Sequence, residues 1–455
     1  MLKDEIFKAN DIRGLVAGPS PQWDEAGARA LGVAYGQLLG AGETVVVGRD
    51  MRQSGVELGQ AFIAGVTSQG VNVVLIGLAS TDQLWFASGW LDLPGVQFTA
   101  SHNPAAYNGV KFCRRQAQPV SPQWLVDLAQ LAQRYDAAPS TQPAPSPQPG
   151  TVREQDVLPD YAAYLHRLVP LEGWRRLKVV VDAGNGMAGH TAPAVLEPLN
   201  VEVIGLFMDL DGSFPNHQPN PLVPENLFDA QAAVKRTGAD VALVFDGDAD
   251  RCFVIDEQGQ TVNPSTITAL IAASELAREP GGVIVVNTVT SDIVRQTVAQ
   301  LGGRVVESQV GHTYVKAAMA EHQAIFGGEH SAHYYFRDFW GADTGMLAAL
   351  HVLAQLGRSD RVLSDLAAAY SGGSASGEIN STVTDPQATM TKVAAAFADR
   401  GQVQWGDGVK IVGSGWWFNL RPSNTEPLLR LNVEAADLDQ MTAIRDDVLG
   451  LVRAA

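Results

Sequence analysis

Three aspartates stand at alternate positions in the run DGDADR, which directly follows the apolar run VALVF. Carboxylates so close together repel one another, and a divalent cation held by Asp246, Asp248 and Asp250 is the usual remedy. A calcium loop ending at Glu257 is one alternative, but such a loop needs glycine where Arg251 stands and helices on both sides. Because VALVF and CFVID indicate strands, the pattern favours Mg²⁺; a solvated acidic turn is the simpler alternative.

A serine follows another strand-like run, in the stretch VQFTASHNP. At the end of a buried strand, Ser101 can act as a nucleophile or phosphoryl carrier, with His102 and Lys111 as nearby electrostatic or proton-transfer groups. Asn-Pro and Asn-Gly pairs also punctuate turns, so a role for Ser101 as a turn or cap hydroxyl is the alternative.

A third polar loop, GGEHSAH, carries groups that suit sugar hydroxyls. It offers a carboxylate, a hydroxyl and two imidazoles as hydrogen-bond partners, from Glu329, His330, Ser331 and His333. For His333 alone, a satisfied structural histidine is the alternative. No carboxylate or thiolate spacing completes a zinc site here.

A fourth loop, RPSNTEP, follows the apolar run WWFNL and combines a guanidinium, hydroxyls, an amide and backbone N–H groups. Such a set binds a phosphate dianion well, and we expect it to be formed by Arg421, Ser423, Asn424 and Thr425, with Arg430 just beyond. A turn rich in small polar residues is the alternative.

The first three loops each end one copy of a repeated strand pattern. Short β-branched runs that alternate with helical stretches predict α/β domains with largely parallel buried strands. The runs lie at 44–47, 71–77 and 96–100, at 179–181, 201–207 and 241–245, and at 283–286, 304–308 and 324–328. Ligands of α/β sheets gather beyond the carboxyl ends of strands, so a shared active site is expected there.

Two stretches predict breaks between domains: the proline-rich run at 137–149 and the small-residue run SGGSASG at 371–377. After residue 377 the strand pattern changes, which indicates a smaller α+β domain. We therefore expect four domains, three similar α/β units with mixed, largely parallel sheets and a smaller α+β unit, at 1–150, 151–256, 257–370 and 371–455.

Composition limits the partners of this chain of 455 residues. A formal net charge of −17 disfavours binding to nucleic acid or anionic membranes. The N-terminal run MLKDEIFKAN has no apolar core of a signal peptide, and no run approaches the length of a transmembrane helix. Two distant cysteines, Cys113 and Cys252, form no metal cluster or disulfide framework. A location in the cytoplasm is the expectation.

Together and in this order, the four loops resemble the alpha-D-phosphohexomutase superfamily over essentially the whole chain. TASHNPAAYNGVKF is similar to its phosphoserine loop, DGDADR to its metal loop, GEHSAH to its sugar loop and RPSNTEPLLR to its phosphate loop. Weaker matches are FKANDIRG at 7–14, VGRDMRQSG at 47–55, DGSFPNHQPNPL at 211–222 and VGHTYVK at 310–316. The resemblance implies four domains around a central cleft.

The resemblance also implies a reaction, the exchange of a phosphoryl group between the 1- and 6-hydroxyls of a hexose through phosphorylated Ser101 and a hexose 1,6-bisphosphate. Mg²⁺ would be held by Ser101 and the three aspartates, and a trace of the bisphosphate would activate the enzyme. Lys111 and His333 are candidates for the general acid and base, with Arg13, Arg251 and His312 as electrostatic partners. The expected substrate-binding residues are His102, Glu329, His330, Ser331, Arg421, Ser423, Asn424, Thr425 and Arg430.

The letters of the sugar loop favour mannose phosphate as the substrate, with glucose phosphate or use of both sugars as the alternative. Phosphoglucosamine mutases typically carry glutamine where His330 stands, which makes glucosamine phosphate less favoured. The chain departs from the family at Asn10, where tyrosine is common, and at Thr81-Asp82, where Thr-Pro is common. A sugar-phosphate binding protein without activity and a phosphatase with Asp246 as nucleophile remain the competing functions.

Overall fold

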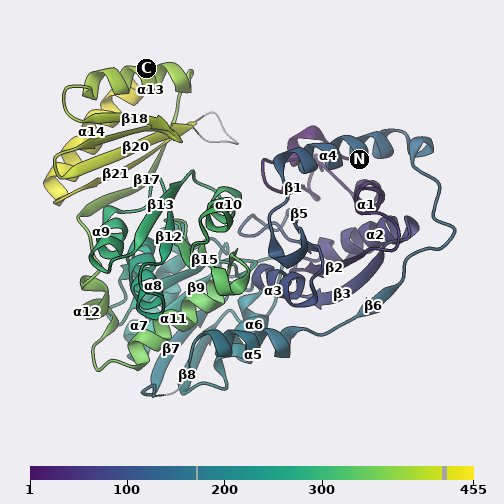
Figure 1. Cartoon of the computed structure of the whole chain (residues 1–455), viewed down its shortest axis with the longest axis horizontal. Coiled ribbons are helices and arrows are strands. Elements are labelled where there is room, and N and C mark those ends of the chain that lie inside the picture. Colours follow the sequence, from purple (N-terminus) through teal and green to yellow (C-terminus); the bar gives the residue numbers. More distant parts are fainter. Residues whose placement is uncertain (171–172, 423–427, 455) are drawn as a thin grey trace. The chain divides into compact units, whose positions relative to one another are not determined.

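The structure is a computed structural model that describes residues 1–170, 173–422 and 428–454. These residues form two compact units, of which the first contains Met1–Pro264 and Ser331–Leu366. The second contains Ser265–His330 and the described residues from Ala367 onward. Figure 1 colours both units along the sequence. In the described ranges no helix has the length and apolar character needed to cross a bilayer.

The first sheet of unit 1 has the order β1-β5-β4-β2-β3-β6. Its strands are β1 (Ile12–Leu15), β2 (Thr44–Arg49), β3 (Asn72–Leu78), β4 (Gly95–Phe98), β5 (Tyr107–Cys113) and β6 (Val152–Glu154). Strands β2, β3, β4 and β6 run parallel, whereas β5 pairs antiparallel with both β4 and β1. Its helices are α1 (Glu25–Leu39), α2 (Ser54–Ser68), α3 (Thr81–Leu91) and α4 (Pro122–Ala137).

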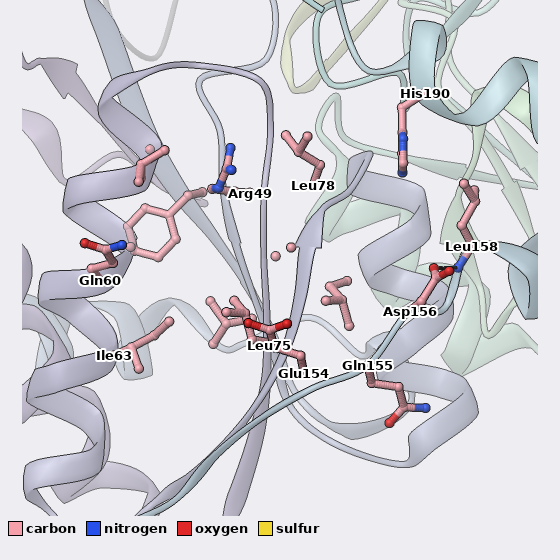
Figure 2. A pocket seen from close by; sticks show the side chains of 18 residues that line it. Arg49, Gln60, Ile63, Leu75, Leu78, Glu154, Gln155, Asp156, Leu158 and His190 are labelled. Atoms are coloured by element: carbon pink, nitrogen blue, oxygen red, sulfur yellow. Dashed lines mark hydrogen bonds between the residues drawn. The ribbon is translucent and has the colours of Figure 1, made fainter.

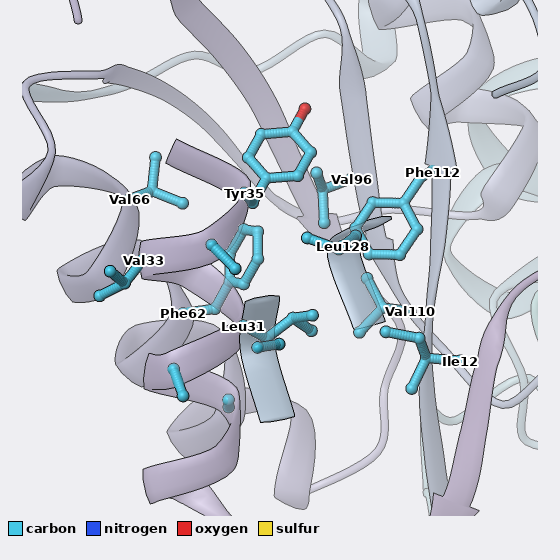
Figure 3. Close-up of a cluster of buried hydrophobic side chains, with 14 of the residues drawn as sticks. Ile12, Leu31, Val33, Tyr35, Phe62, Val66, Val96, Val110, Phe112 and Leu128 are labelled. Carbon is cyan, nitrogen blue, oxygen red and sulfur yellow. The ribbon is translucent and has the colours of Figure 1, made fainter. Parts of the chain in front are cut away.

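Strand β2 forms where the sequence analysis expects it because its β-branched run is buried on both faces, with Val45 and Val46 fully buried. Figure 3 shows the core that covers this sheet, where Tyr35 and Phe62 pack beside Phe112 and Leu128. Helices α1 and α2 touch through glycines. A Cβ on Gly32 would lie 2.1 Å from the carbonyl oxygen of Phe62, so only glycine allows this packing.

The second sheet of unit 1 has the order β11-β10-β9-β7-β8. Its strands are β7 (Leu177–Asp182), β8 (Val201–Leu206), β9 (Val241–Phe245), β10 (Cys252–Asp256) and β11 (Thr261–Val262). Its helices are α5 (Leu158–Leu168), α6 (Ala188–Leu196) and α7 (Phe228–Thr237). Strand β7 is parallel to β8 and β9, and β10 returns antiparallel to β9. Unit 1 also holds the antiparallel pair β15 (Tyr334–Phe336) and β16 (Ala342–Asp343), followed by α11 (Gly345–Gly357).

Unit 2 contains the parallel strands β12 (Val283–Asn287), β13 (Arg304–Ser308) and β14 (Phe326–Gly328). Helices α8 (Pro264–Arg278), α9 (Asp292–Gln300) and α10 (His312–His322) accompany them. The C-terminal part of unit 2 is an antiparallel sheet in the order β17-β21-β20-β19-β18 with two helices. These are β17 (Ser374–Thr382), β18 (Gln402–Gly406), β19 (Gly408–Gly413), β20 (Trp416–Pro422), β21 (Leu428–Ala435), α13 (Pro386–Phe397) and α14 (Leu438–Arg453).

The predicted α/β class is confirmed, as are the nine repeated strands and the smaller C-terminal α+β part. The sheets extend past two of the expected domain boundaries. Strand β6 lies beyond residue 150 and still pairs with β3, and β11 lies beyond residue 256 and pairs with β10. Backbone pairing therefore continues across the proline-rich segment at 137–149 and across the boundary expected at residue 256.

Candidate active site

Two of the polar loops in unit 1 connect a parallel strand to an antiparallel one. The loop after β4 carries Ser101, and the loop between β9 and β10 carries the three aspartates. The two loops touch, because a Cβ on Gly247 would lie 2.5 Å from the carbonyl oxygen of Ser101. Glycine at position 247 thus allows the expected nucleophile and metal ligands to meet.

Ser101 is buried and has a left-handed backbone with φ of 49°. This conformation is uncommon for a residue with a side chain and marks a loop held in shape by its surroundings. The hydroxyl donates to Oδ2 of Asp246 at 2.9 Å and lies 3.2 Å from Nδ1 of His102. The backbone N–H of Ser101 donates to the hydroxyl of Thr99.

The guanidinium of Arg52 holds the serine loop from below the surface. Nη2 donates to the carbonyl oxygens of Ser101 and Asn103, at 2.8 and 2.6 Å. Nη1 donates to the carbonyl oxygens of Pro104 and Tyr107, and Nε pairs with Asp50. One planar cation therefore fixes four carbonyl groups of the loop, an arrangement that the fork of arginine suits and that lysine cannot reproduce.

The aspartate triplet is fully buried and only partly neutralised. Arg251 binds Oδ2 of Asp246 through Nε and Nη2, at 2.9 and 2.8 Å. The ammonium of Lys111 bridges Oδ2 of Asp248 and Oδ2 of Asp250, at 2.7 and 2.6 Å. The Oδ1 atoms of these same two aspartates are buried without a hydrogen-bond partner among the described residues.

These three carboxylates have one oxygen each within 4.8 Å of one another, so they can hold a metal ion. An all-oxygen donor set suits Mg²⁺, which prefers a few carboxylates completed by water or phosphate oxygens. The unpartnered Oδ1 atoms fit that role, because a buried acceptor without a donor is costly unless a cation binds it.

The charges of the site shift the pKa values of its neighbours. Burial alone would lower the pKa of Lys111, but Asp248 and Asp250 outweigh it and raise that pKa, so the ammonium stays protonated. Burial and then Arg251 and Arg13 lower the pKa of His102 well below its usual range. His102 is therefore a neutral imidazole that accepts from Nη2 of Arg251 at 2.6 Å.

His333 lies on the other side of the triplet, within unit 1. Its Nδ1 is 3.0 Å from Oδ2 of Asp343 and 4.0 Å from Oδ1 of Asp250. Burial would lower its pKa, but Asp250 and Asp343 raise it above the usual value. The three side chains form a second group whose ligand atoms lie close enough to hold a metal ion.

Three further residues of unit 1 are the expected residues Arg13 and Ser331 and the unexpected Thr81. Arg13 of β1 donates to Oδ1 of Asn103 in the serine loop at 2.8 Å, and it pairs with Asp11. Thr81, the first residue of α3, donates its hydroxyl to Oδ2 of Asp248 at 2.6 Å and its N–H to the carbonyl oxygen of Asp248. Ser331 is half-buried just before β15.

In unit 2, the sugar-loop residue Glu329 is buried at the end of β14. It accepts from Nδ2 of Asn287 at 2.9 Å and from the N–H of Gly311 at 3.1 Å. His312, the first residue of α10, follows Gly311 directly. His330 is partly buried with Nδ1 3.5 Å from the hydroxyl of Ser265, and burial lowers its pKa.

The expected phosphate loop is described only in part. Arg421 and Arg430 face each other across β20 and β21, and both pair with Glu378 of β17. The closer pair is Nη2 of Arg421 with Oε2 of Glu378, at 2.9 Å. The loop residues Ser423, Asn424 and Thr425 lie outside the described residues. The two arginines and one glutamate leave a net positive charge suited to an anion.

A cavity of about 630 Å³ lies in unit 1 at the carboxyl ends of β2 and β3 (Figure 2). Its lining includes the apolar side chain of Leu75 and the polar side chains of Arg49, Asp156 and His190. Neither Ser101 nor the aspartate triplet lines it. The chemistry of the triplet therefore does not depend on this cavity.

Sequence reasoning missed several residues that shape the site: Arg52, Thr81, Asp343, Asn287 and Glu378. Arg52 lies in VGRDMRQSG, a stretch noted for its resemblance but assigned no role. Thr81 precedes Asp82, where the family commonly has proline, and this difference could have drawn attention to the segment. The remaining three sit in strands or at strand ends far from the loops in sequence, and no local pattern marks them.

Comparison with known families matches four consecutive models to the chain. They are described as phosphoglucomutase/phosphomannomutase alpha/beta/alpha domains I, II and III and C-terminal domain, and they match residues 4–138, 159–259, 263–371 and 378–451.

Relatives are similar over the whole length. The phosphomannomutase of Salmonella typhimurium is 39% identical over 99% of this chain and 100% of its own. The phosphomannomutase/phosphoglucomutase of Pseudomonas putida is 35% identical over 98% of this chain and 95% of its own. A crystal structure of a phosphoglucomutase/phosphomannomutase family protein from Burkholderia thailandensis has a TM-score of 0.89 at 32% identity, covering 100% of this chain and 98% of that one.

Proposed function

Because the chain belongs to the phosphoglucomutase/phosphomannomutase family, it is a phosphohexomutase, an enzyme of the isomerase class, and we propose that it interconverts mannose 1-phosphate and mannose 6-phosphate in the cytoplasm. Glucose phosphates are the second pair of substrates, in line with the double name of the Pseudomonas putida relative. The observation that carries the proposal is the contact of the Ser101 hydroxyl with Asp246, beside two buried carboxylates with unpartnered oxygens.

Ser101 is the phosphoryl carrier in this proposal. Its hydroxyl is buried beside Asp246 at the edge of the triplet, so a phosphoryl group on it lies among Lys111, Arg251 and the aspartates. Asp246, Asp248 and Asp250, with the phosphoserine, would hold Mg²⁺, which would supply positive charge to offset the charge on the serine oxygen as it leaves. The cations of the chain provide the rest of that stabilisation.

The substrate enters with its phosphate on the arginines of the C-terminal sheet. Arg421 and Arg430 both pair with Glu378, and Ser423, Asn424 and Thr425 supply further donors to the same phosphate. Glu329, His330 and Ser331 bind the sugar hydroxyls, with His312 beside them. The free hydroxyl of the sugar then attacks the phosphoserine and yields a hexose 1,6-bisphosphate.

The bisphosphate must turn end over end so that its other phosphate can return to Ser101. An intermediate that escapes leaves an unphosphorylated serine, so a trace of bisphosphate is needed as activator. Asp248 and Asp250 raise the pKa of Lys111 against the effect of burial, so it stays an ammonium that supplies positive charge and hydrogen bonds to the phosphoryl group and gives up its proton less readily. Asp343 orients His333, which leaves Nε2 available to a substrate hydroxyl.

The test is an assay of the purified enzyme with mannose 1-phosphate, Mg²⁺ and a trace of hexose 1,6-bisphosphate. Isomerised product supports the mutase, free phosphate would indicate the phosphatase with Asp246 as nucleophile, and no turnover would indicate a binding protein. Intact-mass analysis should show one phosphoryl group on Ser101. A phosphoryl group on Asp246 would overturn the assignment.

Two additions to this assay separate the finer proposals. Chelation of Mg²⁺ should abolish turnover, and added Mg²⁺ should restore it; full activity in excess chelator would exclude the metal. Mannose and glucose differ only at the 2-hydroxyl, so their kcat/KM values should lie within about a hundredfold, as expected for one hydrogen bond. A higher kcat/KM for glucosamine phosphate would overturn the proposed sugar but leave the phosphoserine intact.

A further inference from the structure

Asp82 is a buried carboxylate that three hydroxyl groups bind. Ser80 donates to Oδ1 at 2.5 Å, while Tyr161 and Thr344 both donate to Oδ2 at 2.7 Å. The donors come from the start of α3, from α5 and from the residue that caps α11. One side chain thus joins three segments of unit 1 that lie far apart in the sequence.

The residue next to Asp82 contacts the triplet directly. Thr81 donates both its hydroxyl and its N–H to Asp248, to Oδ2 and to the carbonyl oxygen. Ser80 on the other side caps α3 by accepting from the N–H of Gln83, and the same hydroxyl donates to Asp82. Because Ser80, Thr81 and Asp82 are consecutive, the bonds on Asp82 fix where the Thr81 hydroxyl lies.

The same carboxylate reaches the other side of the triplet. Its partner Thr344 follows Asp343, which binds His333 at 3.0 Å. Burial raises the pKa of Asp82 to about 6, and the bonds from Ser80, Thr344 and Tyr161 oppose that rise. A carboxylate kept at such a site needs a reason, since burying it is unfavourable and an apolar side chain would avoid that cost.

We propose that Asp82 is a positioning residue for the metal site, which holds Thr81 against Asp248 and so keeps the aspartate triplet in the geometry that binds the cation. The inference rests on the proposed metal site. It concerns a residue that touches neither the substrate nor the metal ligands and acts through the Thr81 hydroxyl. Partners that orient ligands of a metal typically change metal affinity by about 10- to 100-fold when they are removed.

The experiment measures the dissociation constant of Mn²⁺, a paramagnetic substitute for Mg²⁺, by electron paramagnetic resonance on the full-length, dephosphorylated enzyme without substrate. Asp82→Asn and Thr81→Val should each weaken Mn²⁺ binding about tenfold. The double variant should be no weaker than the worse single variant, because both changes remove the same coupling. Thr81→Ser keeps the hydroxyl and should restore the affinity.

Tyr161→Phe is the matched control, since it removes one donor to Asp82 but leaves Ser80 and Thr344 in place. This variant should lower the melting temperature, while the Mn²⁺ affinity stays within about twofold of the wild type. Loss of one hydrogen bond to the metal ligands would change the affinity by more than that. If Asp82→Asn fails to fold, Asp82→Pro replaces it, because proline is accepted in the first turn of a helix.

An unchanged Mn²⁺ affinity in a folded Asp82 variant, with a lower melting temperature alone, would overturn the proposal. Additive losses in the double variant would also overturn it, since Asp82 would then act independently of Thr81. Failure of the wild-type enzyme to bind Mn²⁺ would instead overturn the metal site itself. The two failures are therefore distinguishable.

Discussion

In the loop Asp246–Arg251, three buried carboxylates meet two cations, whereas in the C-terminal sheet two arginines share one glutamate. The first region has an excess of negative charge and is bound by Lys111 of β5, by Thr81 of α3 and by its own Arg251. In the second, two guanidinium groups lie close together, and both pair with Glu378. The aspartate loop therefore suits a cation, and the arginine pair suits an anionic phosphate.

This difference in charge indicates which kinetic quantity each region should control. The aspartate loop is the proposed metal site and binds the hydroxyl of Ser101, the proposed phosphoryl carrier. Interactions there would change during phosphoryl transfer, so changes there should reduce kcat. The arginine pair is proposed to bind a phosphate that stays intact during the transfer, so changes there should raise KM with little effect on kcat. Three sets of variants test this division, and a fourth tests the environment of His330.

Ser101→Ala should have the largest effect. Removal of the nucleophile should reduce kcat by at least about 10⁴-fold, as for other enzymes that lose their nucleophile. Because the change removes one oxygen atom and Arg251 still binds Asp246, the melting temperature should change little. The measurements are kcat in the coupled assay and the phosphoryl content by intact mass. Ser54→Ala in α2 is the control, and residual turnover of the Ser101 variant near the wild-type value would break the comparison.

Arg52→Lys should come next. Lysine cannot reach four carbonyl groups at once, so the loop that carries Ser101 should shift, and a shift of about 1 Å can cost about a hundredfold in rate. We expect the loss in kcat, with KM nearly unchanged, together with a lower melting temperature. Arg49→Lys is the matched control because Arg49 is near in sequence and donates only to the carbonyl oxygen of Asp50 among the bonds described. Equal losses in both variants would contradict the role of Arg52.

Arg421→Ala should act on KM. A hydrogen bond to a charged group is worth about 1.5–3 kcal/mol, so KM for the hexose phosphate should rise about ten- to hundredfold. Arg400→Ala, which removes an exposed pair with Asp447 in the same domain, should change KM little. Glu378→Gln should lower KM severalfold, because the arginines then lose a competitor for the phosphate. A fall in kcat alone for Arg421→Ala would break the division.

His330→Gln should have the smallest effect, and on stability. Burial lowers the pKa of His330 in the folded protein below its ordinary value of 6.5, with Glu378 opposing the shift. The unfolded chain then binds the extra proton more readily, so stability is lost as pH falls below about 6.5. Between pH 6.5 and 5 the melting temperature of the variant should fall less than that of the wild type. The corresponding difference in the free energy of unfolding should be less than about 1 kcal/mol. A steeper fall would reverse the sign of the pKa shift.

Much of the fold could be predicted because the parallel strands have a local signature. A run such as VVV at 45–47 must be buried on both faces, and its β-branched residues show this in the sequence. The antiparallel return strand β5 was not anticipated, because Tyr107–Cys113 carries polar residues of the site, among them Lys111, and has no apolar run. Residues of the candidate site stand there in place of the apolar residues that would mark a strand.

The charged loops of the candidate site could be predicted from the sequence, because the alternate spacing of Asp246 and its neighbours indicates a cation site. Arg52 and Glu378 could not be found in this way. Their roles depend on which carbonyl or guanidinium the fold brings to them, and that information is in the pairing of distant strands and loops, not in the residues beside them. Asp82 is intermediate between these cases. It differs from the proline that is common in the family, which the sequence shows, but nothing in the sequence identifies its hydroxyl partners.

The proline-rich segment at 137–149 offers a practical use for the protein. Most of its side chains from 138 onward are exposed, but the chain returns to the first sheet at β6, where Val152–Glu154 pairs with β3. Its ends are thus anchored on one rigid domain while the middle faces solvent. A fluorescent label or an affinity peptide inserted near residue 144 should be displayed without disturbing catalysis, which makes this segment a handle for following or capturing the working enzyme.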